Sequence, residues 1–138
     1  MSLFKIFDVA GSAMSAQTVR LNVVASNLAN ADNVSGTAQG AYKAKHPVFK
    51  TLLDAANHGD NASSGVMVSD IVESTEPAQK RYMPQHPAAD GEGYVYLPNI
   101  NPIEEMVNMI SASRSYQSNV EVMNTSKELL LRTLGLGQ

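Results

Sequence analysis

The residue types that most often do chemistry are few in this chain, and they are widely spaced. The three histidines are His46, His58 and His86, and none of them forms an i,i+4 pair with an acid or a second histidine on a predicted helix, as a helical metal site would require. His46 and His86 each precede a proline, and a residue in that position favours an extended loop. We therefore expect no metal site and no catalytic histidine.

Other catalytic motifs are also missing. The sequence contains no cysteine, which excludes disulfides, thiolate metal sites and a cysteine nucleophile. It has no phosphate-binding glycine loop and no nucleophile elbow. The run DGEG at residues 90–93 has too few carboxylates for a calcium site and predicts a turn before the strand-like GYVYL. The sequence therefore predicts a protein that is not an enzyme and that has no catalytic, cofactor-binding or metal-binding residues.

Composition excludes further functional classes. A chain of 138 residues suits one small domain, and its 43% apolar content can form a core. The formal charge of -3 argues against a general nucleic-acid binder, which normally has a basic excess. No apolar run approaches the roughly 18 residues of a membrane span, and Asp8 interrupts any signal-peptide core. We expect no nucleic-acid partner, no direct membrane insertion and no cleaved signal peptide, so the chain is either cytoplasmic or exported without one.

The first thirty residues have a heptad pattern that predicts one long helix. The residues that follow alternating steps of four and three are Leu3, Phe7, Ala10, Met14, Gln17, Leu21, Val24 and Leu28. A helix over residues 3–30 would be roughly 42 Å long. We expect it to end between Asn30 and Asn33, where asparagine and the following Gly36 supply turn chemistry.

A second heptad helix is predicted in the C-terminal third. Asn101 is the expected N-cap and Pro102 the first helical residue. The seam, which is interrupted by two polar members, contains Met106, Met109, Ser113, Tyr116, Val120, Met123, Lys127, Leu130 and Leu134. Lys127 and Arg132 near the end suit the helix dipole, and Gly135 ends the helix.

Between the helices the sequence changes character. Residues 32–65 are rich in Gly, Ser, Asn and Ala and are expected to form a linker and loop, and residues 66–100 contain short β-prone runs that predict two or three strands in a hairpin-like insert. The predicted fold is mainly α with a small β insert. The N-terminal helix in residues 1–31 and the C-terminal helix in residues 101–138 are expected to pair as an antiparallel coiled coil.

The N-terminal helix has an unusually neutral surface. Residues 9–31 contain Arg20 as their only charge, and a stripe of Asn22, Ser26, Asn30 and Asn33 recurs at helical spacing. A helix that faces water on its other sides normally carries Lys and Glu there. A neutral surface helix is one interpretation. The other, which we favour, is that further protein surrounds the helix, and because so small a chain has little to cover a second face, we expect assembly with other subunits.

These segments resemble a known family. The run SAMSAQTVRLNVVASNLANADNVSG, which contains an Asn-Leu-Ala-Asn box, is similar to the N-terminal signature of bacterial flagellar rod and hook proteins. The runs AYKAKHPVF and GYVYLPNINPIEEMVNMISASRSYQSNVEVMNTSKELLLRTLGLGQ are similar to the corresponding segments of the flagellar basal-body rod protein family. The short chain resembles the proximal rod proteins of that family most.

The resemblance implies a structural subunit that polymerises through its terminal helices into the helical drive shaft used in motility. It implies localisation in the periplasm-spanning rod of the basal body, and partners that are other flagellar rod proteins, copies of the same chain and the flagellar type III export apparatus. Export would not involve a cleaved signal peptide. The alternative function is a cytoplasmic coiled-coil adaptor or chaperone that binds a partner helix, which shares the heptads but does not account for the neutral surface.

Two groups of residues are the candidate assembly sites. The expected helix-seam residues are Leu3, Phe7, Met14, Leu21, Val24, Leu28, Met106, Met109, Tyr116, Val120, Met123, Leu130 and Leu134. The candidates for contacts between subunits are Gln17, Asn22, Asn27, Asn30, Arg114 and Gln117. Arg114 is included because it lies off the seam in a neutral stretch, where its guanidinium can form an ion pair or bind an amide.

Overall fold

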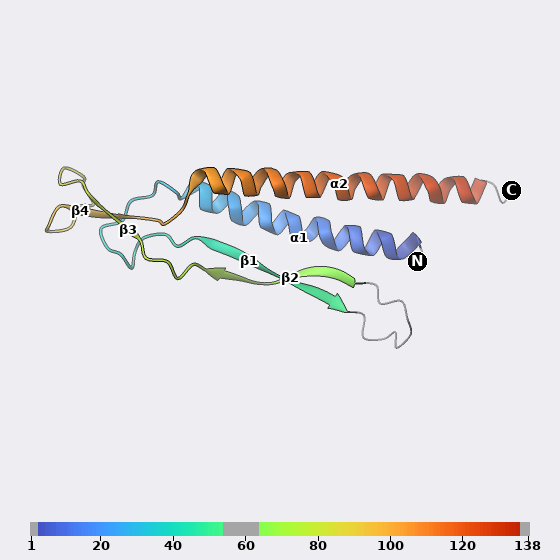
Figure 1. The fold of residues 1–138 in the computed structure, drawn as a ribbon, viewed down its shortest axis with the longest axis horizontal. Helices are drawn as coiled ribbons and strands as arrows, with labels where there is room; N and C mark the ends of the chain where they lie inside the picture. The colour runs from blue at the N-terminus through green and yellow to red at the C-terminus, as the bar shows by residue number, and fades with distance from the viewer. Residues whose placement is uncertain (1–2, 54–63, 136–138) are drawn as a thin grey trace.

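The computed structural model describes residues 3–53 and 64–135. In it two long helices lie side by side in opposite directions, so that both ends of the chain are at the same end of an elongated molecule (Figure 1). The elements in chain order are helix α1 (Leu3–Ala29), strands β1 (Lys45–Leu53), β2 (Ser64–Glu73), β3 (Gln79–Tyr82) and β4 (Tyr94–Leu97), and helix α2 (Pro102–Gly135). The prediction of a mainly helical chain with a small β insert is confirmed.

The helix boundaries agree closely with the prediction. Helix α1 ends at Ala29, and the N–H of Asn30 is shared between the carbonyl oxygens of Ser26 and Asn27. At the start of α2 the N–H of Ile103 donates to the side-chain oxygen of Asn101 at 3.1 Å, which is the expected N-cap bond. Helix α2 has 34 residues and α1 has 27, and α2 extends past the N-terminal end of α1 (Figure 1).

The strands form two separate antiparallel pairs. β1 pairs with β2 over nine residue pairs with an irregularity between Val48 and Phe49, and β3 pairs with β4 over four. The three β-prone runs of residues 66–100 are confirmed as β2, β3 and β4. Strand β1 was not predicted, because its segment falls in the range expected to be a linker. Pro47 made it a poor strand candidate, and an edge strand tolerates proline because the outer edge needs no N–H.

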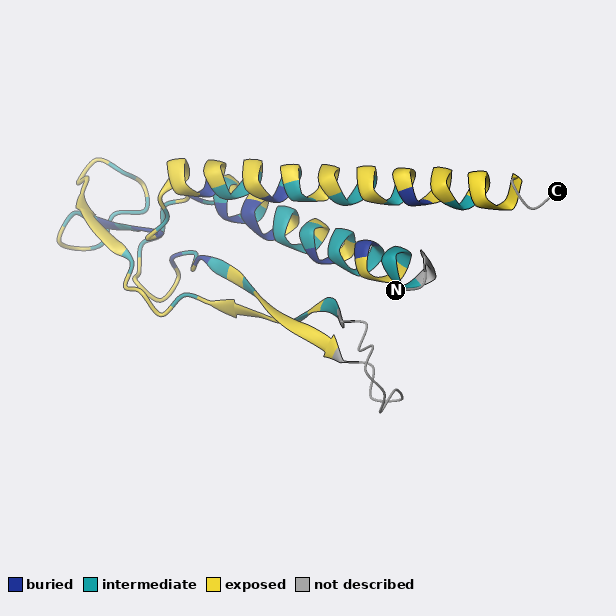
Figure 2. Ribbon diagram, turned by 45° about the vertical axis from the view of Figure 1, so that its right-hand side comes forward, coloured by how far each residue is buried: buried dark blue, intermediate teal, exposed yellow. Residues whose placement is uncertain are grey.

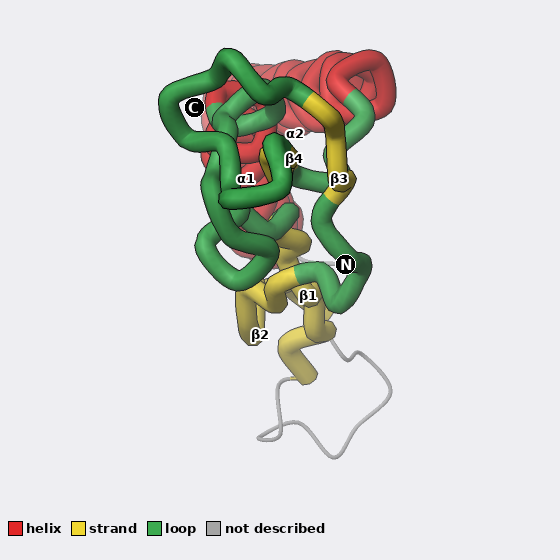
Figure 3. Tube along the Cα trace, turned by 90° about the vertical axis from the view of Figure 1, so that its left-hand side faces the viewer, coloured by secondary structure: helices red, strands yellow, loops and turns green. Residues whose placement is uncertain are grey.

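Helix α1 is the middle layer of the molecule. Helix α2 covers one side of it and the β1–β2 hairpin covers another (Figures 1 and 3). Figure 2 shows the consequence, since α1 is mostly buried or half-buried while the outer side of α2 and much of the hairpin are exposed. The buried apolar residues of the helices are small, and they are Ala10, Ala16, Val23, Val24 and Ala112. Small side chains allow the layers to approach closely.

The β3–β4 pair lies at the end opposite the two termini (Figure 1). Ser35, in the loop after α1, forms an isolated bridge with Tyr96 of β4 through backbone bonds of 2.9 and 2.8 Å. Val95 beside it is fully buried. The predicted turn at residues 90–93 is present, and Oδ1 of Asp90 accepts the N–H groups of Glu92 and Tyr94. This end is therefore attached to α1 as well as to the start of α2.

Candidate functional site

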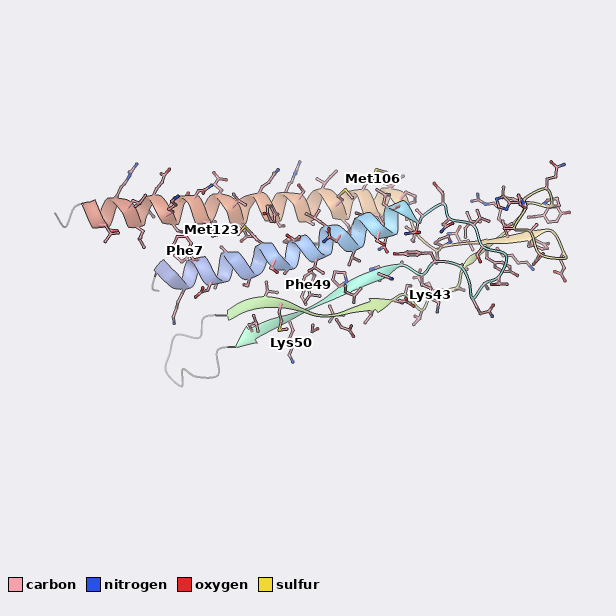
Figure 4. All side chains as sticks on the ribbon, turned by 180° about the vertical axis from the view of Figure 1, so that it is seen from behind. Phe7, Lys43, Phe49, Lys50, Met106 and Met123 are labelled. Atoms are coloured by element: carbon pink, nitrogen blue, oxygen red, sulfur yellow. The ribbon has the colours of Figure 1, made fainter. Side chains whose placement is uncertain are left out.

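The first surface to consider is the seam between the two helices. Figure 4 shows Phe7 of α1 and Met123 of α2 between the helices. Of the other predicted seam residues of α1, Val24 is buried. Met14, Leu21 and Leu28 are half-buried. The side chain of Leu3 lies outside the described part of the structure.

On α2 the structure places the seam differently from the expected pattern. Met109, Val120, Met123 and Leu130 are half-buried, but Tyr116 is 36%, Met106 46% and Leu134 64% exposed. The most buried residues of α2 are Glu105, Ala112 and Ser126, which recur with the heptad period and precede the predicted row by one residue. Small and polar residues fill this row because α1 approaches closely there, so hydrophobic periodicity did not reveal it. Leu134 is exposed because α2 extends past α1.

The second face of α1 faces the hairpin. Ser12, Ala16, Val23 and Asn27 share one face by helical spacing, and Ala16 and Val23 are 3% and 6% exposed. Ser12 and Asn27 are hydrogen-bonded to the hairpin. The face of α1 that carries Ser12 and Asn27 is thus covered by the chain itself, whereas Asn22 and Asn33 of the neutral stripe are exposed. Our expectation that a chain of this size has little to cover that face was wrong, because it left out strand β1.

Asn27, in the predicted Asn-Leu-Ala-Asn box, joins three elements. It is 1% exposed. Its Nδ2 donates to the carbonyl oxygen of Lys45 at 2.9 Å and to Oε2 of Glu105 at 3.1 Å. Its Oδ1 accepts the N–H of Lys45 at 2.9 Å and the hydroxyl of Tyr42 at 3.1 Å. The amide thus uses both donors and both acceptor positions, and it binds both backbone groups of Lys45 as a neighbouring strand would.

Ser12 makes a similar contact at the other end of the hairpin. Its Oγ accepts the N–H of Val66 in β2 at 3.2 Å and donates to the carbonyl oxygen of Val9 at 2.9 Å. A two-stranded ribbon twists strongly, so it presents the edge of β1 to α1 at Lys45 and the edge of β2 at Val66. Two polar side chains of α1 therefore hydrogen-bond to one edge of each strand. They lie roughly 22 Å apart along the helix at ~1.5 Å per residue.

Glu105 is the only buried carboxylate among the described residues. It lies in the first turn of α2, where the helix dipole favours negative charge, and Asn27 donates to it. Next to it, the guanidinium of Arg20 donates to the side-chain oxygen of Asn108 at 3.2 Å. These residues border a pocket of about 320 Å³, which is also lined by Val24, Lys45, His46, Pro47 and Phe49. The pocket mixes charges and apolar groups without a convergent catalytic set, and no three acidic or imidazole side chains in the described residues gather as metal ligands would.

One carboxylate has a perturbed pKa, and it lies far from this junction. The N–H of Tyr94, followed by that of Glu92, holds the pKa of Asp90 below its ordinary value, and Lys80 and the Tyr96 hydroxyl act in the same direction. Lys80 also lies 3.9 Å from the centre of the Tyr94 ring. The arrangement stabilises a turn.

The residues expected to contact other subunits have different surroundings. Asn27 is enclosed within the chain, and Nδ2 of Asn30 donates to the carbonyl oxygen of Ser26 at 2.8 Å. Oε1 of Gln17 is buried and has no hydrogen-bond partner in the described part of the chain. Asn22 of α1, and Arg114 and Gln117 of α2, are exposed.

The outer side of α2 carries an exposed stripe. It begins with Ile103, Val107 and Ile110, which are 69%, 60% and 54% exposed, and continues at helical spacing with Arg114 and Gln117. At ~3.6 residues per turn this stripe is opposite the row of Glu105, Ala112 and Ser126 that faces α1. A soluble helix seldom turns its apolar residues directly away from its own protein. The stripe is therefore a candidate interaction surface on α2.

Sequence reasoning missed Tyr42 and Lys45, and it assigned Glu105 only to the helix dipole, without its hydrogen bond to Asn27. The first two lie beyond the end of α1, in a segment without periodicity, and only the return of the chain along α1 brings them to Asn27. A glutamate beside a heptad seam was the available signal for Glu105. No helix in the described part of the chain is long and apolar enough to cross a bilayer.

Comparison with known proteins identifies the family. Residues 7–36 match a family model described as flagella basal body rod protein, and residues 92–136 match one described as flagellar basal body rod FlgEFG protein C-terminal. Over 138 residues the chain is 54% identical to the flagellar basal-body rod protein FlgC of Escherichia coli O6:H1 and 53% identical to that of Salmonella typhimurium, with 100% of both chains covered in each case. It is 37% identical over 150 residues to the same protein of Bacillus subtilis, again with both chains fully covered. The identity over the full length of these relatives shows that the chain belongs to the FlgC family of flagellar basal-body rod proteins and is a structural subunit of the rod, not an enzyme.

Proposed function

We propose that this subunit joins the rod through the outer stripe of α2, which packs against helices of neighbouring rod subunits. The single observation that carries the proposal is the position of Ile103, Val107 and Ile110, which are exposed on the side of α2 opposite α1. Burying an exposed aliphatic side chain contributes roughly 1.5–3 kcal/mol. Arg114 and Gln117 extend the same stripe with groups that bind carboxylates or amides across an interface. The neighbours are copies of this chain and other rod proteins.

We further propose that α1 and α2 form an antiparallel coiled coil in the assembled rod. The two rows of α2 that face α1 support this, since one contains Met109, Tyr116, Met123 and Leu130 and the other Glu105, Ala112 and Ser126, each with the heptad spacing. Residues 1–31 and 101–138 are then the assembling part of the chain. The extension of α2 past α1 exposes Leu134, whose partner is a neighbouring subunit.

The route to the rod is also a proposal. We propose that the chain passes through the flagellar export apparatus without losing an N-terminal signal, and that it crosses the periplasm as part of the rod without inserting into a membrane or binding nucleic acid. The packing of α1 supports retention of residues 3–29 in the mature subunit, because they form the middle layer of the molecule. The intact mass of the chain in isolated basal bodies tests the route. The full-length mass is expected, and a mass lacking the first helix would contradict it.

Substitution on the outer side of α2 tests the assembly surface. Ile110→Lys places a charge on the stripe, whereas Val122→Lys places one at another exposed apolar position of α2, about 120° around the helix. Both variants are expected to retain the helical circular dichroism of the unchanged chain. Ile110→Lys is expected to abolish swimming and incorporation into basal bodies, and Val122→Lys to retain both. Normal incorporation of the Ile110→Lys chain would contradict the proposal.

A further inference from the structure

The two strands of the β1–β2 hairpin carry opposite charges. Strand β1 contains Lys45, His46 and Lys50 and no acidic residue, while β2 contains Asp70 and Glu73 and no basic residue. Lys50, Asp70 and Glu73 are exposed, and in the described part of the chain no ion pair joins one strand to the other. Figure 4 shows Lys50 pointing away from α1. These charges are therefore available to a partner outside the chain.

Each strand also has a stretch of edge that no other described backbone group pairs with. Thr51 is opposite Val66, and residues directly opposite in an antiparallel pair direct their backbone groups alike, either toward each other or away. Val66 donates outward to Ser12, so Thr51 directs its N–H and C=O away from β2. By the same reasoning Glu73, opposite Lys45, directs its backbone groups away from β1. The open edge of β1 is thus near Lys50, and that of β2 is near the two acids.

The surroundings of these edges are apolar and uncovered. Val48 and Leu52 of β1 are 40% and 45% exposed, and Met67 and Val72 of β2 are 42% and 43% exposed. An open, partly apolar strand edge readily pairs with another strand, and a two-stranded ribbon is marginal without further packing. On the β2 edge, the outward N–H of Ile71 donates to Oδ1 of Asp70 at 2.8 Å, so Ile71 keeps only its carbonyl oxygen for a neighbouring strand. The other oxygen of Asp70 is left for a cation.

We propose that the hairpin is a second assembly surface, on which the Lys50 edge of β1 in one copy docks against the Asp70 and Glu73 edge of β2 in the next copy. Charge selects this arrangement, because β1 against β1 or β2 against β2 would oppose like charges. Such a contact is heterologous, and repeated from copy to copy it produces a helical row. The inference rests on the proposal that copies of this chain are neighbours in the rod, and it is independent of the α2 stripe.

Disulfide trapping tests the contact directly, since the chain has no cysteine of its own. A chain carrying Thr51→Cys and Ile71→Cys is assembled in cells, basal bodies are isolated and oxidised, and the chain is analysed on a non-reducing gel. Within one chain these positions cannot react. Ile71 pairs with Pro47, so Thr51 lies roughly 14 Å farther along β1 at ~3.4 Å per residue, beyond the about 7 Å that a disulfide spans between Cα atoms.

The expected result is a ladder of dimers and larger species from the double variant and none from either single variant. A chain with Thr51→Cys and Arg81→Cys, whose second site is exposed on β3, is the matched control and is expected to remain monomeric. Dimers from a single variant would show pairing of like edges and overturn the proposal. Double-variant chains that enter the rod without forming a ladder would also overturn it.

Charge variants provide an independent test if the cysteine variants do not assemble. Lys50→Glu is expected to reduce incorporation at least about fivefold, whereas Lys43→Glu, the same change on an exposed loop residue, is expected to leave it unchanged. Coexpression of the Lys50→Glu chain with a chain carrying Asp70→Lys and Glu73→Lys is expected to restore incorporation, because every hairpin contact is then again between opposite charges. Absence of rescue would overturn the hairpin contact. Absence of the unchanged chain from basal bodies would instead contradict the proposed function.

Discussion

Replacing Asn27 by alanine is expected to break the junction between α1, α2 and the hairpin. The substitution removes the hydrogen bonds to Lys45, Tyr42 and Glu105, all from an amide that is 1% exposed. Each bond contributes about 0.5–1.5 kcal/mol net, and a buried group left without a partner costs about 1–3 kcal/mol. Glu105 is 8% exposed, so its carboxylate and the backbone of Lys45 are the groups most affected. We expect a loss of about 3–4 kcal/mol in the free energy of unfolding.

The same substitution at Asn22 is the matched control. Asn22 is on the same helix but exposed, and alanine is the better helix former by up to about 0.7 kcal/mol, so Asn22→Ala is expected to be neutral or slightly stabilising. Urea unfolding followed by far-ultraviolet circular dichroism gives both free energies. A difference between the two variants of less than about 1 kcal/mol would refute the assignment of Asn27 as the residue that joins the layers.

Three further predictions follow from single residues. Gln17→Leu is expected to stabilise the chain by about 1–2 kcal/mol in the same unfolding assay, because Oε1 of Gln17 is buried without a described partner; a loss of stability would show that this oxygen is satisfied. Gly93→Ala is expected to lower the free energy of unfolding by about 1–2 kcal/mol, because Gly93 has a φ of 82° and a Cβ there would lie 3.0 Å from the Tyr82 ring. Gly91→Ala, whose added Cβ would have no atom within 4 Å, is expected to be neutral. Equal effects of the two substitutions would argue against the turn. The pKa of Asp90 is lowered in the folded chain chiefly by the N–H of Tyr94. The ionised Asp90 therefore contributes to stability at pH values above its unfolded-state pKa, and this contribution is lost as the pH falls through the lower folded-state pKa. An NMR titration with a midpoint at or above the ordinary aspartate value would contradict this.

The helices could be predicted because their signals are local and repeated. The heptads and the cap at Asn101 located both helices to within a residue. Strand β1 could not be found in the same way, since Pro47 and flanking charges obscure its alternation and only pairing with β2 makes it a strand. The exact seam of α2 was also hidden, because Glu105 is hydrogen-bonded to Asn27 and Ser126 is buried, and apolar periodicity does not report buried polar residues.

For the candidate site too, local sequence patterns were predictable and contacts between distant segments were not. The neutral surface of α1 was interpreted as a contact with other subunits, and this stays a prediction for its exposed member Asn22. The sequence did not reveal that the hairpin of the same chain covers the neighbouring face with Ser12 and Asn27. Asn27 was expected to meet another subunit, and the structure encloses it because Lys45 returns alongside α1. Arg114 and Gln117 remain candidates for such contacts, since both are exposed on the outer side of α2.

The central claim is that α1 is the middle layer of each subunit, between α2 and the hairpin, and that the outer side of α2 makes the contact with neighbouring subunits. Cryo-electron microscopy of the rod in isolated basal bodies tests it most directly. The account predicts that α1 and α2 remain antiparallel, that Asn27 stays against Lys45, and that Ile103, Val107 and Ile110 pack on helices of adjacent subunits. A map in which this side of α2 faces water, or in which α1 leaves α2 to pair elsewhere, would contradict it.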